Sequence, residues 1–459
     1  MKIALDAMGG DLAPKAAVEG GVLAARDFNI EVVMVGDRDI LQRELSEHDS
    51  GGLPIRIEHA SEVILMDDSP LESVLEKPDS SIHVGLELVK RGDADGFISA
   101  GNSGTVMTAA MAILGTLPTV DRPAIASVVP TSQGMALLID AGANTEVKPI
   151  NLVQFAVMGS VYWRRVRNVS RPRVGILSNG EESSKGTELT RAAAQMLGQM
   201  PTYVNYVGYV EGRDINRGKT DVIVTDGFTG NVALKTMEGF STFMSGNIRD
   251  LFGGSWPGRL AFFMVRKRIG AMRERLDPHE YGGAPLLGVG GVAIIAHGSS
   301  NPRAIRNAIR SAANEALVRH VNSEIVEILT KSQPGVALKP AGKGIRALFS
   351  KMRERLHRHP KDQIRTGTGS LEPIRESGPL GEHPQEHPNE HPSEHPPERS
   401  AEHHSTTVIA AEGTRMIDSA PALTMTSNGN TPATIATPAP APEKPSSSEH
   451  PSDPPKGDR

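Results

Sequence analysis

The chain of 459 residues contains no cysteine. This absence excludes disulfide bonds, thiolate metal sites and any reaction that passes through a thioester on the protein itself. It also fits a reducing, cytoplasmic environment. Aromatic residues are scarce, at 4% of the chain, and Phe349 is the last of them. We therefore expect one folded domain in residues 1–330 and little packed core beyond it.

Long apolar runs and a strong net charge are missing as well. No stretch reaches 18 apolar residues, so the sequence predicts no membrane-spanning helix. The chain begins M-K-I-A-L-D, which reaches an acid without an apolar run, so no signal peptide is expected. The net charge of −5 is mild and gives no reason to expect a nucleic-acid partner.

Short β-branched and aliphatic runs alternate with segments of helical pattern in the first 330 residues. This alternation predicts an α/β fold with a mostly parallel sheet that helices cover on both faces. Ligands of such sheets bind at the carboxyl ends of the strands. The expected strands are residues 3–6, 31–36, 96–99, 125–129, 136–140, 174–178, 221–226 and 292–297, and the clearest expected helices are 105–114, 187–200 and 303–320.

Four loops after these strands are rich in glycine and in capping side chains. They read D-A-M-G-G-D at 6–11, S-A-G-N-S-G-T at 99–105, D-G-F-T-G-N at 226–231 and H-G-S-S-N-P at 297–302. Each suits an ordinary strand-to-helix turn, but free N–H groups at such turns also bind anions. Because four loops fall at strand ends, we expect them to share one crevice. The candidate phosphate- and substrate-binding residues are Asp6, Gly9, Gly10, Asn102, Ser103, Gly104, Thr229, Gly230, Ser299 and Ser300.

A fifth loop, S-N-G-E-E-S-S-K-G-T-E at 178–188, adds a positive charge directly after another strand. In a loop above a phosphate crevice, Lys185 would act as an anion clamp. The alternative is an exposed lysine neutralised by the neighbouring acids Glu181, Glu182 and Glu188. The spacing leaves both interpretations open.

Nucleotide motifs are incomplete. The segment G-G-S-W-P-G-R at 253–259 spaces two glycines like a P-loop but has Arg259 where lysine belongs. The segment G-V-G-G at 288–291 lacks the third glycine of a dinucleotide fingerprint. The pattern therefore supports neither ATP nor NAD, and no cofactor is expected.

Taken together, these segments closely resemble the acyl carrier protein-dependent phosphate acyltransferases of bacterial phospholipid synthesis. The matching stretches, in the family's order, are A-L-D-A-M-G-G-D, F-I-S-A-G-N-S-G-T, L-I-D-A-G-A-N, G-I-L-S-N-G-E-E-S-S-K-G-T, D-V-I-V-T-D-G-F-T-G-N-V-A-L-K and I-I-A-H-G-S-S-N. They are spread over residues 1–330, and the resemblance says nothing about residues 331–459.

The resemblance implies a three-layer α/β/α fold similar to isocitrate and isopropylmalate dehydrogenases and to phosphotransacetylases. It implies a homodimer without a metal, which reversibly converts acyl-[acyl-carrier-protein] and inorganic phosphate to acyl phosphate and free acyl carrier protein. The family gives active-site roles to the residues that match Lys185 and Asn231. A cytoplasmic enzyme at the inner face of the membrane is expected, with the membrane acyl phosphate:glycerol-3-phosphate acyltransferase as a further partner.

The residues present suit this chemistry. Phosphate is a competent nucleophile at neutral pH, so no serine–histidine pair is needed. The protein must hold two reactants in line and stabilise the oxyanion that develops on the thioester carbonyl. Backbone amides of the glycine loops, Asn231 and Lys185 suit those tasks. His297 is a candidate to protonate the leaving thiolate or to orient phosphate, and its alternative is a structural hydrogen-bonding role.

Residues 259–276 have the pattern of a basic amphipathic helix, within a segment at 240–276 that we expect to protrude. An apolar stripe at helical spacing is bordered by several arginines and lysines, which suits an anionic bilayer surface. The alternative is that the stripe packs on a partner subunit. The candidate membrane-contact residues are Trp256, Phe262, Val265, Ile269 and Met272.

The end of the chain has a different composition. The pattern of residues 331–359 predicts a second basic amphipathic helix. The composition of residues 360–459, with a repeated E-H-P unit, predicts a disordered tail. Two other functions stay open for the whole chain. One is a metal- and NAD-dependent dehydrogenase on the related fold, with Asp221 and Asp226 as available carboxylates, and the other is a membrane-surface scaffold for lipid synthesis.

Overall fold

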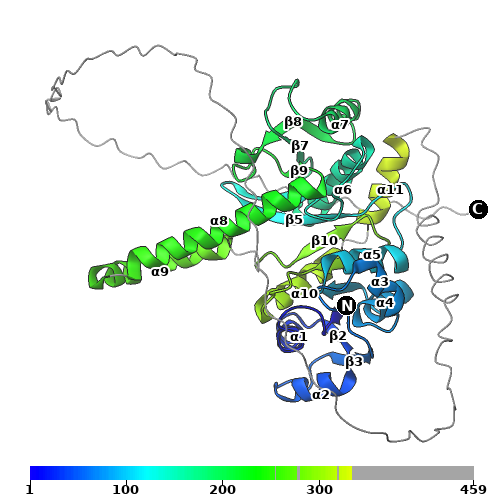
Figure 1. Cartoon of the computed structure of the whole chain (residues 1–459), viewed down its shortest axis with the longest axis vertical. Coiled ribbons are helices and arrows are strands. Elements are labelled where there is room, and N and C mark those ends of the chain that lie inside the picture. The colour runs from blue at the N-terminus through cyan, green and yellow to red at the C-terminus, as the bar shows by residue number, and fades with distance from the viewer. Residues whose placement is uncertain (254, 277–279, 318–319, 333–459) are drawn as a thin grey trace, which may run out of the picture. The chain divides into compact units, whose positions relative to one another are not determined.

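Figure 1 shows the computed structural model of the chain, in which residues 1–253, 255–276, 280–317 and 320–332 are described. The basic helix predicted for residues 331–359 lies outside these ranges except for its first two positions. The tail predicted for residues 360–459 lies wholly outside them.

The described residues build one sheet of eleven strands in the order β3-β2-β1-β4-β11-β10-β5-β6-β9-β7-β8. Neighbouring strands are parallel except in the pairs β10–β11, β10–β5 and β5–β6 near the middle. The predicted mostly parallel α/β sheet is therefore confirmed. The strands are β1 (Lys2–Asp6), β2 (Glu31–Gly36), β3 (Ile55–His59), β4 (Gly96–Ser99), β5 (Ala124–Thr131), β6 (Gly134–Ile139), β7 (Arg173–Ser178), β8 (Asn205–Glu211), β9 (Val222–Val224), β10 (Ala284–Leu287) and β11 (Ala293–Ile295).

All eight strands expected from the sequence are present, and three others escaped the pattern. β3 and β8 lie at the two edges of the sheet, where residues are only partly buried and no continuous apolar run marks the strand. β10 contains Pro285, a residue that argues against a strand in a sequence because it cannot donate to the ladder. The missed strands are thus those with the weakest burial or backbone signal.

Helices cover both faces of this sheet, which gives three layers. On the β1 side, α1 and α10 pack on one face and α3, α4 and α5 on the other. On the β6 side, α6, α7 and α11 cover one face, and the first part of α8 covers the other. The helices are α1 (Lys15–Phe28), α2 (Arg38–Ser46), α3 (Pro70–Glu76), α4 (Ser81–Arg91), α5 (Ser103–Ile113), α6 (Pro149–Arg167), α7 (Glu188–Gly198), α8 (Gly227–Gly253), α9 (Trp256–Leu276), α10 (Pro302–Leu317) and α11 (Val321–Ser332).

Helices α8 and α9 form a hairpin that leaves the sheet (Figure 1). The 27 residues of α8 span about 40 Å at 1.5 Å per residue. Leu234 and Met237 pack against the sheet, but Phe240 and Phe243 one or two turns later are 62% and 63% exposed. α9 returns alongside, with the Phe262 ring 5.9 Å from the Phe252 ring of α8. Within the described residues, no helix is both long and apolar enough to cross a membrane.

Helix α11 carries the folded region slightly past the predicted boundary at residue 330. It ends at Ser332, and Leu329 is buried in the core beneath α6. Glu324 on α11 forms ion pairs with Arg164 and Arg165 on α6. Removal of residues within α11 would therefore expose core, and a truncation that spares the fold has to fall after Ser332.

Candidate functional site

The carboxyl ends of β1, β4 and β11 meet in a first group of loops, which we call the β1 cluster. Asp6 lies at its centre with a buried side chain. One carboxylate oxygen accepts the N–H groups of Met8 and Gly9 at 3.1 and 3.0 Å, and the other accepts the Ser99 hydroxyl at 2.6 Å. Burial raises the pKa of Asp6, against the lowering effect of these hydrogen bonds. Asp6 therefore holds the loop in shape through its buried carboxylate.

Glycine is required in this cluster because the loops touch through their backbones. A Cβ at Gly9 would lie 2.3 Å from Asp6 Oδ2 and 2.9 Å from the nitrogen of Gly101. Gly10 has a φ of +104°, which L side chains rarely adopt. Asp11 then donates its N–H to the carbonyl of Gly298 at 2.8 Å. The loops after β1, β4 and β11 are thus in direct contact with one another.

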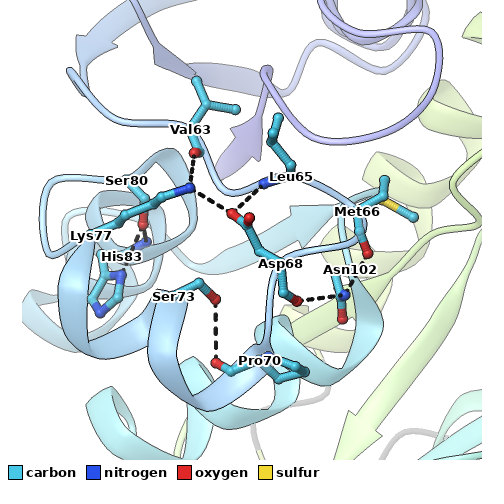
Figure 2. A network of polar contacts seen from close by, with 10 residues as sticks. All are labelled: Val63, Leu65, Met66, Asp68, Pro70, Ser73, Lys77, Ser80, His83 and Asn102. Atoms are coloured by element: carbon cyan, nitrogen blue, oxygen red, sulfur yellow. Dashed lines mark hydrogen bonds and ion pairs between the residues drawn. The ribbon is translucent and has the colours of Figure 1, made fainter. Parts of the chain in front are cut away.

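Asn102 in the β1 cluster caps a helix and ties down a neighbouring segment (Figure 2). Its Oδ1 accepts the N–H of Thr105 at 3.1 Å, while its Nδ2 donates to the carbonyl of Met66 at 2.7 Å. Lys77 fixes the same segment, donating to the carbonyl of Val63 at 3.0 Å and to Asp68 at 2.5 Å. The side chain of Asn102 is therefore engaged in structure. Ser103 and Gly104 form the first turn of α5 and keep its free N–H groups at the cluster.

A second group of loops, the β6 cluster, lies at the carboxyl ends of β6 and β9. Its centre is Asp140, which is fully buried and was not among the predicted site residues. The carboxylate accepts the N–H groups of Ala143 and Asn144, both at 2.8 Å, and the side-chain amide of Asn144 at 2.7 Å. Burial raises the pKa of Asp140 as it does that of Asp6. The segment L-I-D-A-G-A-N repeats the pattern of the β1 loop, in which a strand ends in Asp–Ala and glycine follows, so the sequence did carry this information.

Helix α8 starts against the β6 cluster because two glycines allow close contact. A Cβ at Gly230 would come within 1.9 Å of the Asp140 carbonyl oxygen, and one at Gly227 within 2.6 Å of the Asn144 nitrogen. Asp226 completes the start of α8, accepting the N–H and the hydroxyl of Thr229, both at 2.8 Å. Asn231 follows at the start of the second turn, exposed and beside Gly142.

The Lys185 loop extends from β7 near the β6 cluster, and its lysine is exposed. Of the acids considered as its partners, Glu181 pairs instead with Lys219 at 2.5 Å, which anchors the loop. Gly186 is held by the side chain of Asn179 at 2.9 Å. A groove of about 510 Å³ opens between α7 and the start of α8. It is lined by Thr145, Glu146, Val147, Leu189, Asp226 and Phe228.

Helix α8 connects the two clusters. Two turns after its start, Lys235 places Nζ 3.2 Å from Nε2 of His297, which follows β11 in the β1 cluster. His297 Nδ1 lies 2.8 Å from the hydroxyl of Ser299, and Ser300 is buried next to it. Three of the four predicted loops therefore lie in the β1 cluster and the fourth lies in the β6 cluster, and α8 bridges the two. Lys235 closes the matched segment D-V-I-V-T-D-G-F-T-G-N-V-A-L-K, and no pattern in the sequence indicates that it reaches His297.

The two carboxylates considered for a metal have other partners. Asp221 forms an ion pair with the guanidinium of Arg173, at 3.0 Å, and Asp226 caps the start of α8. In the part of the chain that the structure describes, no three His, Asp or Glu side chains gather in a way that could hold a metal ion.

Fold and site together define an α/β protein with glycine-rich loops at the carboxyl ends of several strands of one sheet. The chain belongs to the fatty acid synthesis protein family, whose family model matches residues 1–323. It is 49% identical over 342 residues to a phosphate acyltransferase of Geobacter sp. (strain M21), an alignment that covers 74% of this chain and 96% of that protein. A phosphate acyltransferase of Geobacter sulfurreducens is 49% identical over 327 residues, covering 71% and 94%. The resemblance found in the sequence is thereby confirmed.

Solved structures also align with the chain. The EutD phosphotransacetylase from Staphylococcus aureus aligns with a TM-score of 0.46 and 17% identity, covering 69% of this chain and 94% of that one. A phosphotransacetylase from Streptococcus pyogenes aligns with a TM-score of 0.47 and 16% identity, with the same coverage.

Proposed function

We propose that the protein transfers an acyl group from the thioester of acyl carrier protein to inorganic phosphate. A phosphate oxygen attacks the thioester carbonyl carbon, the carbon–sulfur bond breaks, and the thiolate of the carrier leaves and takes up a proton. The products are acyl phosphate and free acyl carrier protein, and the reaction is reversible. The observation that carries the proposal is the pair of bridged glycine-loop clusters in a chain so closely related to phosphate acyltransferases.

The residue roles follow from where the groups lie. Lys185, exposed on an anchored loop that leads to the groove-lining Leu189, supplies a positive charge that clamps phosphate. Asn231, exposed near the start of α8, donates to the oxyanion that forms on the acyl carbonyl. The backbone amides at the start of α5, with Ser103 and Gly104, add anion-binding donors. Asp6 and Asp140 act indirectly, by holding the loops in shape.

The direct test incubates the purified full chain with an acyl carrier protein thioester and phosphate. Acyl phosphate, trapped with hydroxylamine as the hydroxamate, should form only when both substrates are present. A parallel incubation with NAD and hydroxy acids should give no change in nicotinamide absorbance. The dehydrogenase alternative predicts that this absorbance changes. Failure to form hydroxamate with an active carrier thioester would refute the proposal and leave the scaffold alternative.

We also place the enzyme in the cytoplasm as a homodimer on the inner face of the membrane. The α8–α9 hairpin supports membrane contact, because its apolar side chains lie exposed beside the exposed basic residues Arg266, Lys267 and Arg268. The predicted stripe has a mixed environment, since Phe262 packs against Phe252 while Trp256 is 76% exposed. The most exposed apolar side chains of α9 also include Leu260, Phe263 and Met264. Released acyl phosphate would then reach the membrane acyl phosphate:glycerol-3-phosphate acyltransferase directly.

Vesicle sedimentation tests this placement. A Phe263→Ser and Met264→Ser double variant should lose binding to anionic vesicles while it keeps its activity on acyl carrier protein thioester. Val207→Ser, which changes a similarly exposed side chain on β8, serves as the matched control. If vesicle binding is unchanged and the double variant instead sediments as a smaller species, a second copy covers this face and the membrane proposal is wrong.

A further inference from the structure

The loop between β3 and α3 carries an apolar run that the fold buries only in part. Residues 63–66 read V-I-L-M. Ile64 is buried and packs in the core with side chains of α4 and α5. The next two side chains, Leu65 and Met66, are 57% and 43% exposed. The loop therefore uses one residue of the run as an anchor and presents two others to solvent.

Polar contacts hold the run in this conformation. The N–H of Leu65 donates to Asp68 at 2.9 Å, and Asp68 in turn pairs with Lys77 at 2.5 Å. The carbonyl of Met66 accepts the side-chain amide of Asn102, the cap of α5, at 2.7 Å. Figure 2 shows the side chains of Leu65 and Met66 directed away from the Lys77–Asp68 pair. The backbone that carries Met66 is thus fixed on both sides of its side chain.

The end of the Met66 side chain lies against the β1 cluster. A Cβ on Gly298 would come within 2.9 Å of Met66 Cε and within 3.4 Å of a carboxylate oxygen of Asp11. The loops after β1 and β11 touch at this point, because the N–H of Asp11 donates to the carbonyl of Gly298. The loop after β4 contributes Asn102, which binds the Met66 carbonyl. Met66 therefore places a half-exposed apolar group where the three loops meet.

The chemistry of this junction suits a ligand whose charged and apolar parts are neighbours. The free N–H groups at the start of α5 bind anions, whereas the Met66 thioether offers van der Waals contact. In an acyl phosphate the phosphate is bonded to the acyl carbon, so the first methylene groups of the chain lie close to the phosphate oxygens. An unbranched methionine side chain adapts well to such a flexible chain.

We propose that Met66 contacts the acyl chain of the substrate near its carbonyl end. The inference rests on the proposed function and adds a residue for the acyl group, since Lys185 and Asn231 are assigned to phosphate and to the oxyanion. A single exposed methionine is ordinary on a protein surface. The fixed backbone of Met66 and its contact with Gly298 distinguish it from such a residue.

The kinetic test uses the full-length protein and the hexadecanoyl thioester of acyl carrier protein. Met66→Ser should lower kcat/KM for this thioester about tenfold, because a polar group replaces the apolar contact. KM for phosphate should stay at the wild-type value, since the backbone of the three loops is unchanged. Met66→Leu should restore most of the loss.

Leu65→Ser is the matched control, since it makes the same kind of change in the same loop on a more exposed side chain. Its kcat/KM should remain close to that of the wild type. An equal loss in Leu65→Ser and Met66→Ser, or a raised KM for phosphate in Met66→Ser, would show that the substitution disturbs the loop and would overturn the inference.

Methyl NMR reads the contact without turnover. In protein labelled with ¹³C-methyl methionine, the Met66 signal is assigned by its loss in Met66→Leu. The hexadecanoyl thioester of the carrier, added without phosphate, should shift this signal, whereas the carrier with a free thiol should leave it in place.

A Met66 signal that does not respond to the thioester, or that responds equally to the free-thiol carrier, would overturn the inference. A signal that moves only with protein concentration would also overturn it, because a second copy of the chain would then cover Met66. Absence of acyl phosphate in the wild type would refute the proposed function, and the methyl signal would still decide whether Met66 contacts the acyl chain.

Discussion

The loops after β1 and β6 are both held by a buried aspartate, but the two aspartates have different hydrogen-bond partners. Both strands end in a buried aspartate, Asp6 or Asp140, whose carboxylate accepts N–H groups of the loop that follows. Asp6 also takes a hydroxyl from Ser99 on another strand, so it joins two loops. Asp140 is satisfied mainly by backbone and by Asn144 of its own loop. Both carboxylates therefore hold the loop that follows them; Asp6 also binds the Ser99 side chain of another strand, whereas Asp140 also accepts the backbone N–H of Ile125 on β5.

This difference suits what each cluster carries. The β1 cluster is an assembly of three loops joined by close backbone contacts. The β6 cluster instead serves as a seat for α8, which presses its first turn against the Asp140 backbone and projects Asn231. We therefore expect substitutions in the β1 cluster to act first on stability and exposed substitutions at the β6 cluster to act first on turnover.

The largest expected effect is on turnover, and it separates Asn231 and Lys185 from Asn102, the asparagine that caps α5. Asn231→Ala and Lys185→Ala should each lower turnover about 10²–10³-fold, since each loses a group that acts on the developing charge. Their unfolding midpoints should stay close to wild type because both side chains are exposed. Asn102→Ala should instead cost about 1 kcal/mol of stability, because it removes the α5 cap. Near-normal turnover in both Asn231→Ala and Lys185→Ala would contradict the roles proposed for these two side chains in binding the oxyanion and phosphate.

The next effect compares the two buried aspartates by urea unfolding. Asp140→Ala should lower the free energy of unfolding by at least about 3 kcal/mol, since several buried backbone N–H groups lose their acceptor and cannot rotate away. Asp6→Ala should cost less, because one of its donors is the Ser99 hydroxyl, which can turn to another acceptor. An equal or larger loss in Asp6→Ala would contradict the contrast between the loops.

A smaller effect isolates the seat of α8. Gly230→Ala should destabilise the protein by about 1–3 kcal/mol, because the new methyl group overlaps the Asp140 carbonyl. Gly246→Ala in the same helix meets nothing within 4 Å and should stabilise by up to about 1 kcal/mol. Thermal unfolding of the pair separates helix propensity from contact, and equal shifts would show that the contact is unimportant.

The last prediction concerns the pH dependence of stability. Asp6 and Asp140 are buried carboxylates with several hydrogen-bond donors, whereas Glu315 is a buried carboxyl with one oxygen that lacks a partner in the described residues. Burial raises the pKa of Glu315 on α10 to about 8, and one of its oxygens has no hydrogen-bond partner in the described part of the chain. Because the folded-state pKa is raised, its stabilising contribution is complete below pH 4.5 and is lost as the pH rises toward about 8. Glu315→Gln should lack this loss, so unfolding free energies of the two proteins should diverge over that interval. Parallel curves would show that Glu315 does not titrate there.

The fold was largely predictable because its information is local. Apolar runs marked the buried strands, and the aspartates and glycines after them marked the loops. The sequence could not show that α8 would carry Lys235 to His297, because that contact joins residues 62 positions apart. Nor could it show that Asp6 faces inward, since a strand-end carboxylate that shapes a loop and one that binds a ligand have the same local pattern.

Isotope transfer tests the central claim, direct attack of phosphate on the acyl carbon, more closely than any substitution. Phosphate labelled with ¹⁸O at every oxygen is incubated with the carrier thioester, and the acyl phosphate is analysed by mass spectrometry. Direct attack predicts a product that keeps all the labelled oxygens, one of them in the bridge to an unlabelled carbonyl, with no acyl group on the protein. Loss of one labelled oxygen, or a stoichiometric acyl group trapped on the chain, would contradict the mechanism.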